Sequence, residues 1–185
     1  MEDLIIEQHP DYENLNQKLL KESEGVIYDW SGITNIKGKM SEWHICGKYI
    51  DVIKEWVKEL VPKVKNRVPM ITNSWYAKYD YDDHAINHNH GDIYASFVYY
   101  VNTPKGSSPI VFTDEDETVE AKEGSILIFP GHVNHYVPPN QCKNRVVIAG
   151  NVDRGIFNFS IPKSFFCSAV ISVQSSFFTG ETSNI

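Results

Sequence analysis

Apolar positions change their spacing near residue 69, from a helical period to a strand-like pattern. Upstream, residues 10–23 and 47–61 carry apolar side chains at helical spacing, and Pro62 ends the second segment. The two stripes consist of Tyr12, Leu15, Leu19 and Leu20, and of Tyr49, Ile53, Trp56, Val57 and Leu60. Both segments are predicted to be helices that pack on a sheet.

Short apolar or aromatic runs follow from residue 69, with turn residues such as Pro104, Gly106 and Gly124 between them. The predicted strands span residues 70–79, 94–102, 109–113, 117–121, 125–129, 133–138 and 144–152. Many short strands separated by turns are typical of an antiparallel β-sandwich or barrel. The pattern therefore predicts a mainly β fold with N-terminal helices.

The segment after residue 153 has a different character. Residues 165–178 are apolar, β-prone and uncharged, so they must join the sheet, pack on the helices or lie in an oligomer interface. Left exposed, such a segment would promote aggregation. We expect one or two additional structural strands, and a homo-oligomer formed through this segment is the alternative.

Composition narrows the class of protein. A chain of 185 residues with 42% hydrophobic and 22% charged residues is expected to form one compact domain. The net charge of -7 argues against a nucleic-acid partner, which usually meets a basic face. Cys46, Cys142 and Cys167 are odd in number and widely spaced, which favours a reducing compartment. The N-terminus lacks signal-peptide features and no apolar run reaches membrane-spanning length, so a soluble, cytoplasmic protein without a membrane partner is predicted.

Candidate metal ligands occur in HNHGD at 88–92 and FPGHVNH at 129–135. Alternate side chains of an extended strand share a face, so His88, His90 and Asp92 can all point one way. Two histidines and one carboxylate, with coordination positions left open, form the ligand set of non-haem iron(II) enzymes that activate oxygen. Arg145, which follows His135, offers a guanidinium fork for a dicarboxylate cosubstrate.

Together these motifs resemble the 2-oxoglutarate- and Fe(II)-dependent oxygenase superfamily, in particular its small uncharacterised prolyl-hydroxylase-like branch. The resemblance covers about residues 71–152 and rests on the ordered segments HNH, SFVYYVNTPKGSSPIVFTDED and KEGSILIFPGHVNHYVPPNQCKNRVVIAGNV. It implies a double-stranded β-helix, or jelly roll, supported by two or more helices. It also implies a hydroxylase that uses Fe(II) and the cosubstrate 2-oxoglutarate, and it leaves ascorbate open as a further cofactor.

The same resemblance suggests one oxygenase domain over residues 1–185. Residues 1–68 would be helical support, residues 69–152 would form the jelly-roll core that carries the site, and residues 153–185 would add strands or a tail.

Carried over to this chain, the resemblance implies that His135 is the distal iron ligand and that Arg145 pairs with the far carboxylate of 2-oxoglutarate. HNHGD fits in two registers. His90 with Asp92 gives the usual histidine and carboxylate pair, whereas His88 with His90 gives a three-histidine site. We favour His88, because a strand resembling the Ser-x-x-x-Tyr strand of the related branch follows it at a similar distance.

Other positions depart from the family pattern or lie beside it. Val147 stands where many relatives have a serine that helps to hold the carboxylate, so Tyr100 or Tyr79 is expected to supply a hydroxyl instead. His84 and His132 are interpreted as loop or rim residues. The acidic run 114–117 is interpreted as a solvated turn.

Two further hypotheses remain open at this point. One is a metal-dependent jelly-roll dioxygenase that does not use 2-oxoglutarate, as in three-histidine thiol dioxygenases, and Arg145 discriminates against it. The other is a non-catalytic jelly-roll binding module, because jelly rolls host many functions. Substrate contacts in such folds come mostly from loops, so the sequence leaves both small-molecule and peptidyl substrates open.

Overall fold

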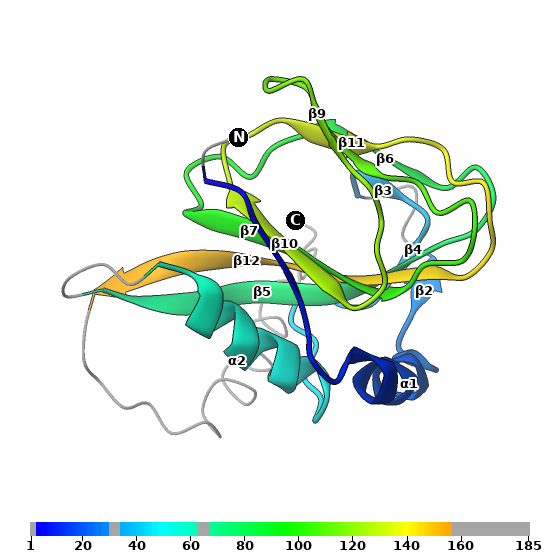
Figure 1. Ribbon diagram of the computed structural model, residues 1–185, viewed down its shortest axis with the longest axis horizontal. Coiled ribbons are helices and arrows are strands. Elements are labelled where there is room, and N and C mark those ends of the chain that lie inside the picture. The colour runs from blue at the N-terminus through cyan, green and yellow to red at the C-terminus, as the bar shows by residue number, and fades with distance from the viewer. Residues whose placement is uncertain (1–2, 30–33, 63–66, 157–185) are drawn as a thin grey trace, which may run out of the picture.

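The computed structural model describes residues 3–29, 34–62 and 67–156 of the chain. Two antiparallel sheets face each other across an interior, and two helices lie against the outer side of the larger sheet (Figure 1). This arrangement confirms the predicted β-sandwich with N-terminal helices. None of the described helices is long and apolar enough to cross a lipid bilayer.

Within the described residues the larger sheet has seven strands and the smaller sheet has five. The larger sheet runs in the order β1 (Ile5–Gln8), β10 (Ser125–Pro130), β7 (Ala95–Asn102), β12 (Arg145–Ile156), β5 (Arg67–Tyr79), β4 (Lys39–Met40) and β2 (Tyr28–Asp29). The smaller sheet runs in the order β3 (Ile36–Lys37), β6 (His84–His88), β11 (His135–Val137), β8 (Ile110–Phe112) and β9 (Glu117–Val119). Several neighbouring strands, such as β6 and β11, are far apart in sequence, which is how distant histidines come together.

Alternation along the central strands creates two apolar cores. On β7, Phe97, Tyr99 and Val101 belong to the core beneath the helices, whereas Val98 and Tyr100 belong to the core between the two sheets. Successive side chains of a strand point to opposite faces, so a central strand buried on both sides is apolar at nearly every position. The second core surrounds the candidate site described below.

The helices α1 (Tyr12–Ser23) and α2 (Ile50–Leu60) are joined by one carboxylate. Glu22 near the end of α1 accepts hydrogen bonds from the backbone N–H of Tyr49 (3.0 Å) and Ile50 (2.8 Å), at the start of α2. It also accepts a hydrogen bond from the buried hydroxyl of Tyr76 on β5 (3.0 Å). An anion at a helix N-terminus satisfies unpaired N–H groups and favours the helix dipole, so Glu22 docks both helices on the sheet.

The predicted helices and the seven predicted strands are present, with ends shifted by a few residues, and the last strand continues to Ile156. The prediction missed β1, the short strands β2, β3 and β4, and β6. Strands of two residues carry no alternating pattern and exist because a neighbouring strand pairs with them. The prediction for residues 165–178 lies outside the described residues, and the division of the chain at 68 and 153 stays a prediction.

Candidate metal centre

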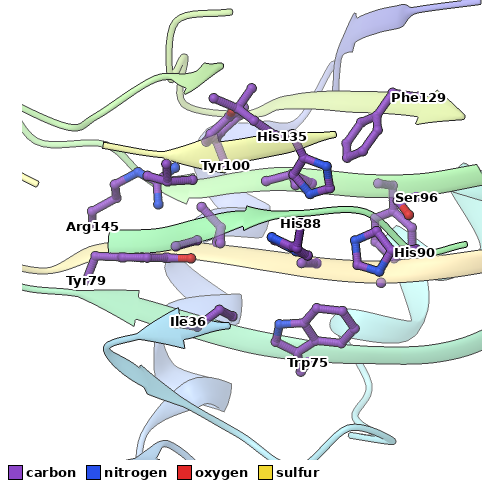
Figure 2. Close-up of a pocket in the computed structure, with 18 residues that line it drawn as sticks. Ile36, Trp75, Tyr79, His88, His90, Ser96, Tyr100, Phe129, His135 and Arg145 are labelled. Carbon is purple, nitrogen blue, oxygen red and sulfur yellow. The ribbon is translucent and has the colours of Figure 1, made fainter. Parts of the chain in front are cut away.

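Three histidine side chains meet between the two sheets. His88 is the last residue of β6 and His135 is the first residue of β11, and the two are directly paired across the sheet. His90 lies two residues beyond β6, and one ring nitrogen of each histidine lies within 4.8 Å of the others. The ring centroids are 4.4 Å apart for His88 and His135, and 5.3 Å apart for His90 and His135 (Figure 2). This grouping has the spacing to hold one metal ion.

Asp92 is exposed and lies outside this group. The predicted alternation required an extended chain from His88 to Asp92, but β6 ends at His88. The chain then turns: Gly91 adopts a φ of 62°, and the backbone N–H of Ile93 donates to the carbonyl of His90 (3.4 Å). Because the turn carries Asp92 away from the histidines, the structure brings together the three-histidine set.

The protonation of the three rings suits metal binding. Burial lowers the pKa of His135 to about 3 and that of His90 to about 4, and it also lowers the pKa of His88. Nδ1 of His88 lies 2.7 Å from the carbonyl oxygen of Ile86, and Nδ1 of His135 lies 3.0 Å from that of Val133. A carbonyl only accepts, so Nδ1 carries the proton in both rings and Nε2 keeps a lone pair for a metal.

Arg145 is a buried cation without a counter-ion among the described residues. Arg145 is the first residue of β12, is paired with Tyr79 on β5, and is 1% exposed. The guanidinium carbon lies 4.6 Å from the ring centroid of Tyr79 and 5.7 Å from that of Tyr100. No described group accepts a hydrogen bond from Arg145 Nε or Nη1, and the buried hydroxyl of Tyr100 likewise has no described partner. A buried charge and unpaired donors are costly unless an anion binds there.

Both tyrosines beside Arg145 remain protonated at neutral pH. Burial raises the pKa of Tyr100 to about 12, although the charge of Arg145 lowers it. Burial also raises the pKa of Tyr79. The positive charge of Arg145 and the hydrogen bond between the Arg145 and Tyr79 side chains partly offset that rise. Tyr100 pairs across the sheet with Val147, which stands where many members of the family that the sequence resembles have a serine hydroxyl. The two phenols are therefore available as donors next to the guanidinium.

Arg145 and the three histidines line a single cavity of about 60 Å³. Arg145 and Tyr79 lie at one end, and His90 and Ser96 lie at the other (Figure 2). The cavity is walled mainly by apolar side chains, including Ile36, Val98, Ile110, Phe129, Val137 and Val147. A narrow, mainly apolar space with an anion site at one end and nitrogen ligands further along suits a small acid that also reaches a metal.

Two lining residues were not singled out as site residues. Trp75 lines the cavity with a buried indole N–H that has no described hydrogen-bond partner. Ser96 lines it too and donates a hydrogen bond to Asn151 Oδ1 (2.8 Å). The signal that could have found them is the strand period, because Trp75 shares a face with Tyr79, and Ser96 shares a face with Tyr100.

The other histidines considered in the sequence lie outside the group. His84 is partly buried at the start of β6, with Nδ1 3.0 Å from the carbonyl oxygen of Asp82. His132 is exposed and, with Asp92, lines a second cavity of about 700 Å³. Phe129 lines both cavities, so the second one adjoins the site.

No protein-family model and no curated protein sequence matches this chain. Solved structures do match it in fold. A viral collagen prolyl hydroxylase from Paramecium bursaria Chlorella virus-1, solved with 2-oxoglutarate, has a TM-score of 0.60 at 14% identity, covering 82% of this chain and 96% of its own. A prolyl hydroxylase from Trichoplax adhaerens, in complex with a hypoxia-inducible factor peptide fragment, has a TM-score of 0.63 at 15% identity, covering 81% and 83%.

A third structure, an oxidoreductase of the 2-oxoglutarate and Fe(II) oxygenase family from Burkholderia pseudomallei, has a TM-score of 0.64 at 9% identity, covering 85% of this chain and 88% of its own. At these identities the likeness is one of fold. It confirms the jelly roll that the sequence resemblance implied.

Proposed function

We propose that the protein is an Fe(II)- and 2-oxoglutarate-dependent oxygenase that hydroxylates a C–H bond of its substrate. The observation that carries the proposal is Arg145, whose buried guanidinium has two N–H-bearing nitrogens without described partners. It lies in the same cavity as three converging histidines. The fold, shared with enzymes that carry this name, supports the proposal.

The donor set fits ferrous iron. His88, His90 and His135 would hold the metal through neutral imidazoles, which suit iron, zinc and copper alike. Three ligands leave coordination positions open for a cosubstrate and oxygen. Because none of the three is anionic, the full charge of a divalent ion stays uncompensated by the protein. That charge favours binding of an anionic chelator at the open positions.

The other end of the cavity fits a carboxylate. Arg145 and the hydroxyl of Tyr100 offer buried donors that no described group uses, and Tyr79 packs against the guanidinium. A guanidinium fork matches a carboxylate in shape and charge. In 2-oxoglutarate, the far carboxylate would pair with Arg145, and the oxo-acid end would face the histidines because all of them line one cavity.

When bound, Fe(II), 2-oxoglutarate and oxygen supply the oxidising chemistry, which belongs to these groups rather than to the protein. The chain's own residues position and shield them. Apart from the histidines, Arg145 and Ser96, the described residues that line this cavity are apolar or aromatic. Apolar walls such as Val98, Phe129 and Val147 exclude water from the site.

For the substrate we propose a small molecule or a peptide, and the peptide is the favoured class. One structural neighbour was solved with a peptide fragment. The cavity of about 700 Å³ beside the site gives room for a ligand larger than the cosubstrate, and Asp92, Tyr94, His132 and Arg154 supply it with polar and aromatic contacts. A cytoplasmic location and a homo-oligomer through residues 165–178 remain predictions.

A second candidate function keeps the metal and omits 2-oxoglutarate. The three-histidine group favours it, because that set lacks the carboxylate of the usual iron triad. The unpartnered buried Arg145 argues against such an enzyme acting on a neutral substrate, because only an acidic substrate or cosubstrate would use the buried anion site. A non-catalytic binding module leaves both features unused.

Anaerobic titration with Fe(II), with and without 2-oxoglutarate, tests the proposal. We expect stoichiometric iron binding and a weak visible charge-transfer band that requires 2-oxoglutarate. His135→Ala should abolish both in a folded protein, and His132→Ala, which changes an exposed histidine nearby, should abolish neither. Iron binding without the band at saturating 2-oxoglutarate would favour the second candidate. No iron binding at all would favour the binding module.

A further inference from the structure

Asn134, which directly precedes His135, uses all of its polar groups in hydrogen bonds. Its backbone N–H and its side-chain Nδ2 both donate to Asp114 Oδ2, at 3.0 and 2.9 Å. Its side-chain Oδ1 accepts from Asn89 Nδ2 at 2.9 Å. Its carbonyl accepts from the backbone N–H of Thr113 at 3.0 Å. One asparagine thus ties together three separate turns of the chain.

Asn89 is the residue between His88 and His90, so its bond to Asn134 links the two segments that carry the candidate metal ligands. The side chain of Asn89 is held in turn, because its Oδ1 accepts from the backbone N–H of Gly91 at 3.1 Å. The Asn89–Asn134 bond therefore lies within one residue of all three histidines.

Strand pairing alone does not hold all three rings in place. His88 and His135 are partners in the sheet, so the ladder sets their separation. His90 lies beyond the end of β6. Its backbone N–H donates to the carbonyl of Gly131 (2.7 Å), and its carbonyl accepts from the N–H of Ile93 within the same turn (3.4 Å). A side-chain link across the turn supplies the restraint that the sheet does not.

We propose that Asn89, Asn134 and Asp114 are positioning residues that set the geometry of the three histidines for the metal. This inference rests on the proposed metal site. Ligands held in place before the metal arrives lose less conformational freedom on binding, so the metal binds more tightly. Asp114, from the acidic run interpreted as a solvated turn, orients Asn134 with its carboxylate.

These hydrogen bonds are exposed to solvent, so each contributes little to global stability. Their loss should therefore appear in the metal site rather than in the unfolding of the protein. Cobalt(II) is a suitable probe, because its visible bands report the coordination geometry as well as occupancy.

The test is a Co(II) titration of the full chain, followed by visible absorption. Asn134→Ala and Asn89→Ala should each weaken Co(II) binding by about tenfold, the lower end of what outer partners of metal ligands contribute, and should alter the visible bands. The double variant should bind less weakly than two independent losses of about tenfold would give, since both changes remove the same link. Asn87→Ala, at an exposed position of β6, is the matched control and should bind like the wild type.

A rescue experiment separates positioning from loss of folding. Asn134→Asp should weaken Co(II) binding, because it places two carboxylates against each other. Combining Asn134→Asp with Asp114→Asn restores a donor and an acceptor in the reverse direction. The Co(II) affinity of this double variant should return to within about threefold of the wild type, a smaller loss than the tenfold loss expected of the alanine variants.

If the wild type binds Co(II) and every variant binds as Asn87→Ala does, the inference is wrong and the metal site stands. If the wild type itself binds no Co(II), the proposed metal site is wrong as well.

Discussion

Arg145 shows how a single residue can be costly for the fold and useful for a ligand. Its side chain is 1% exposed, and two of its nitrogens have no described partner. The faces of Tyr79 and Tyr100 provide partial compensation through cation–π contact. A carboxylate ligand would accept the missing hydrogen bonds, so its binding would remove the free-energy cost of burying an unpaired guanidinium.

The first prediction at this scale concerns Arg145 itself. Arg145→Ala should raise the dissociation constant for 2-oxoglutarate at least about tenfold, equivalent to about 1.4 kcal/mol, and leave Fe(II) binding almost unchanged. Arg145→Lys should fall between, because the charge is kept and the planar fork is lost. Anaerobic titration of both variants with 2-oxoglutarate measures this. Unchanged affinity in Arg145→Ala would mean that the arginine is structural.

A second prediction separates the two ligand registers. His88→Ala should remove most of the Fe(II) affinity, because it deletes one of three converging ring nitrogens. Asp92→Ala should leave the Fe(II) affinity within about threefold of the wild type, because Asp92 is exposed beyond the turn. Even the loss of a residue that only hydrogen-bonds to a metal ligand is expected to cost about 10-fold or more. Iron content after gel filtration and a titration of each variant decide between them. Loss of iron in Asp92→Ala with retention in His88→Ala would restore the carboxylate triad.

At the scale of elements, the site depends on which strands are neighbours. β11 lies between β6 and β8, so His135 faces His88 on one side and Phe112 on the other. β12 lies between β5 and β7, which brings Tyr79 and Tyr100 to either side of the segment that begins with Arg145. The helices take no part in the site, but they cover the other face of the sheet that carries it.

The element-scale prediction is that Glu22 docks the helices. Glu22→Ala should lower the free energy of unfolding by about 1 to 3 kcal/mol, because it leaves N–H groups of α2 and the buried Tyr76 hydroxyl without their acceptor. Urea unfolding provides the measurement. Glu59→Ala, at an exposed position of α2, should change it by less than about 0.5 kcal/mol. Equal effects of the two substitutions would contradict the proposed docking role.

For the whole molecule, the buried histidines predict how stability depends on pH. Their folded pKa values lie below the unfolded value of about 6.5, at about 3 for His135 and about 4 for His90. Between these values the unfolded chain binds protons that the folded protein does not. Stability without metal should therefore fall as the pH falls from about 6.5 towards 4 and should be insensitive to these groups above about 7.

Urea unfolding at pH 7.5, 5.5 and 4.5 tests this, with His135→Ala as the comparison. The wild type should lose about 1 kcal/mol more than His135→Ala between pH 5.5 and 4.5, because one fewer histidine titrates in the variant. Comparing the two slopes cancels the contribution of His9, whose pKa burial also lowers. Parallel slopes would show that His135 is not kept neutral by the fold.

The features that could be predicted from the amino-acid sequence are those with strong local patterns. Short apolar or aromatic runs between turn residues predicted the strands that became β5, β7, β10 and β12, because a central strand buried on both faces is apolar at nearly every position. The spacing of HNHGD, FPGHVNH and Arg145 indicated a metal site with an anion site beside it, because few other roles require these residue types together.

Features that depend on distant partners in the chain could be seen only in the folded protein. The grouping of His88, rather than Asp92, with His90 and His135 follows from the turn at Gly91. Asn89 Nδ2 and the backbone N–H of His90 hold that turn by donating to Asn134 Oδ1 and to the carbonyl of Gly131, about forty residues further along the chain. The short strands β3 and β4 form against the longer strands β6 and β5, and β2 forms against β4. The unpaired state of Arg145 depends on what surrounds it in space, which no local pattern encodes. Local sequence specifies periods and residue types, whereas convergence of side chains is a property of the folded chain.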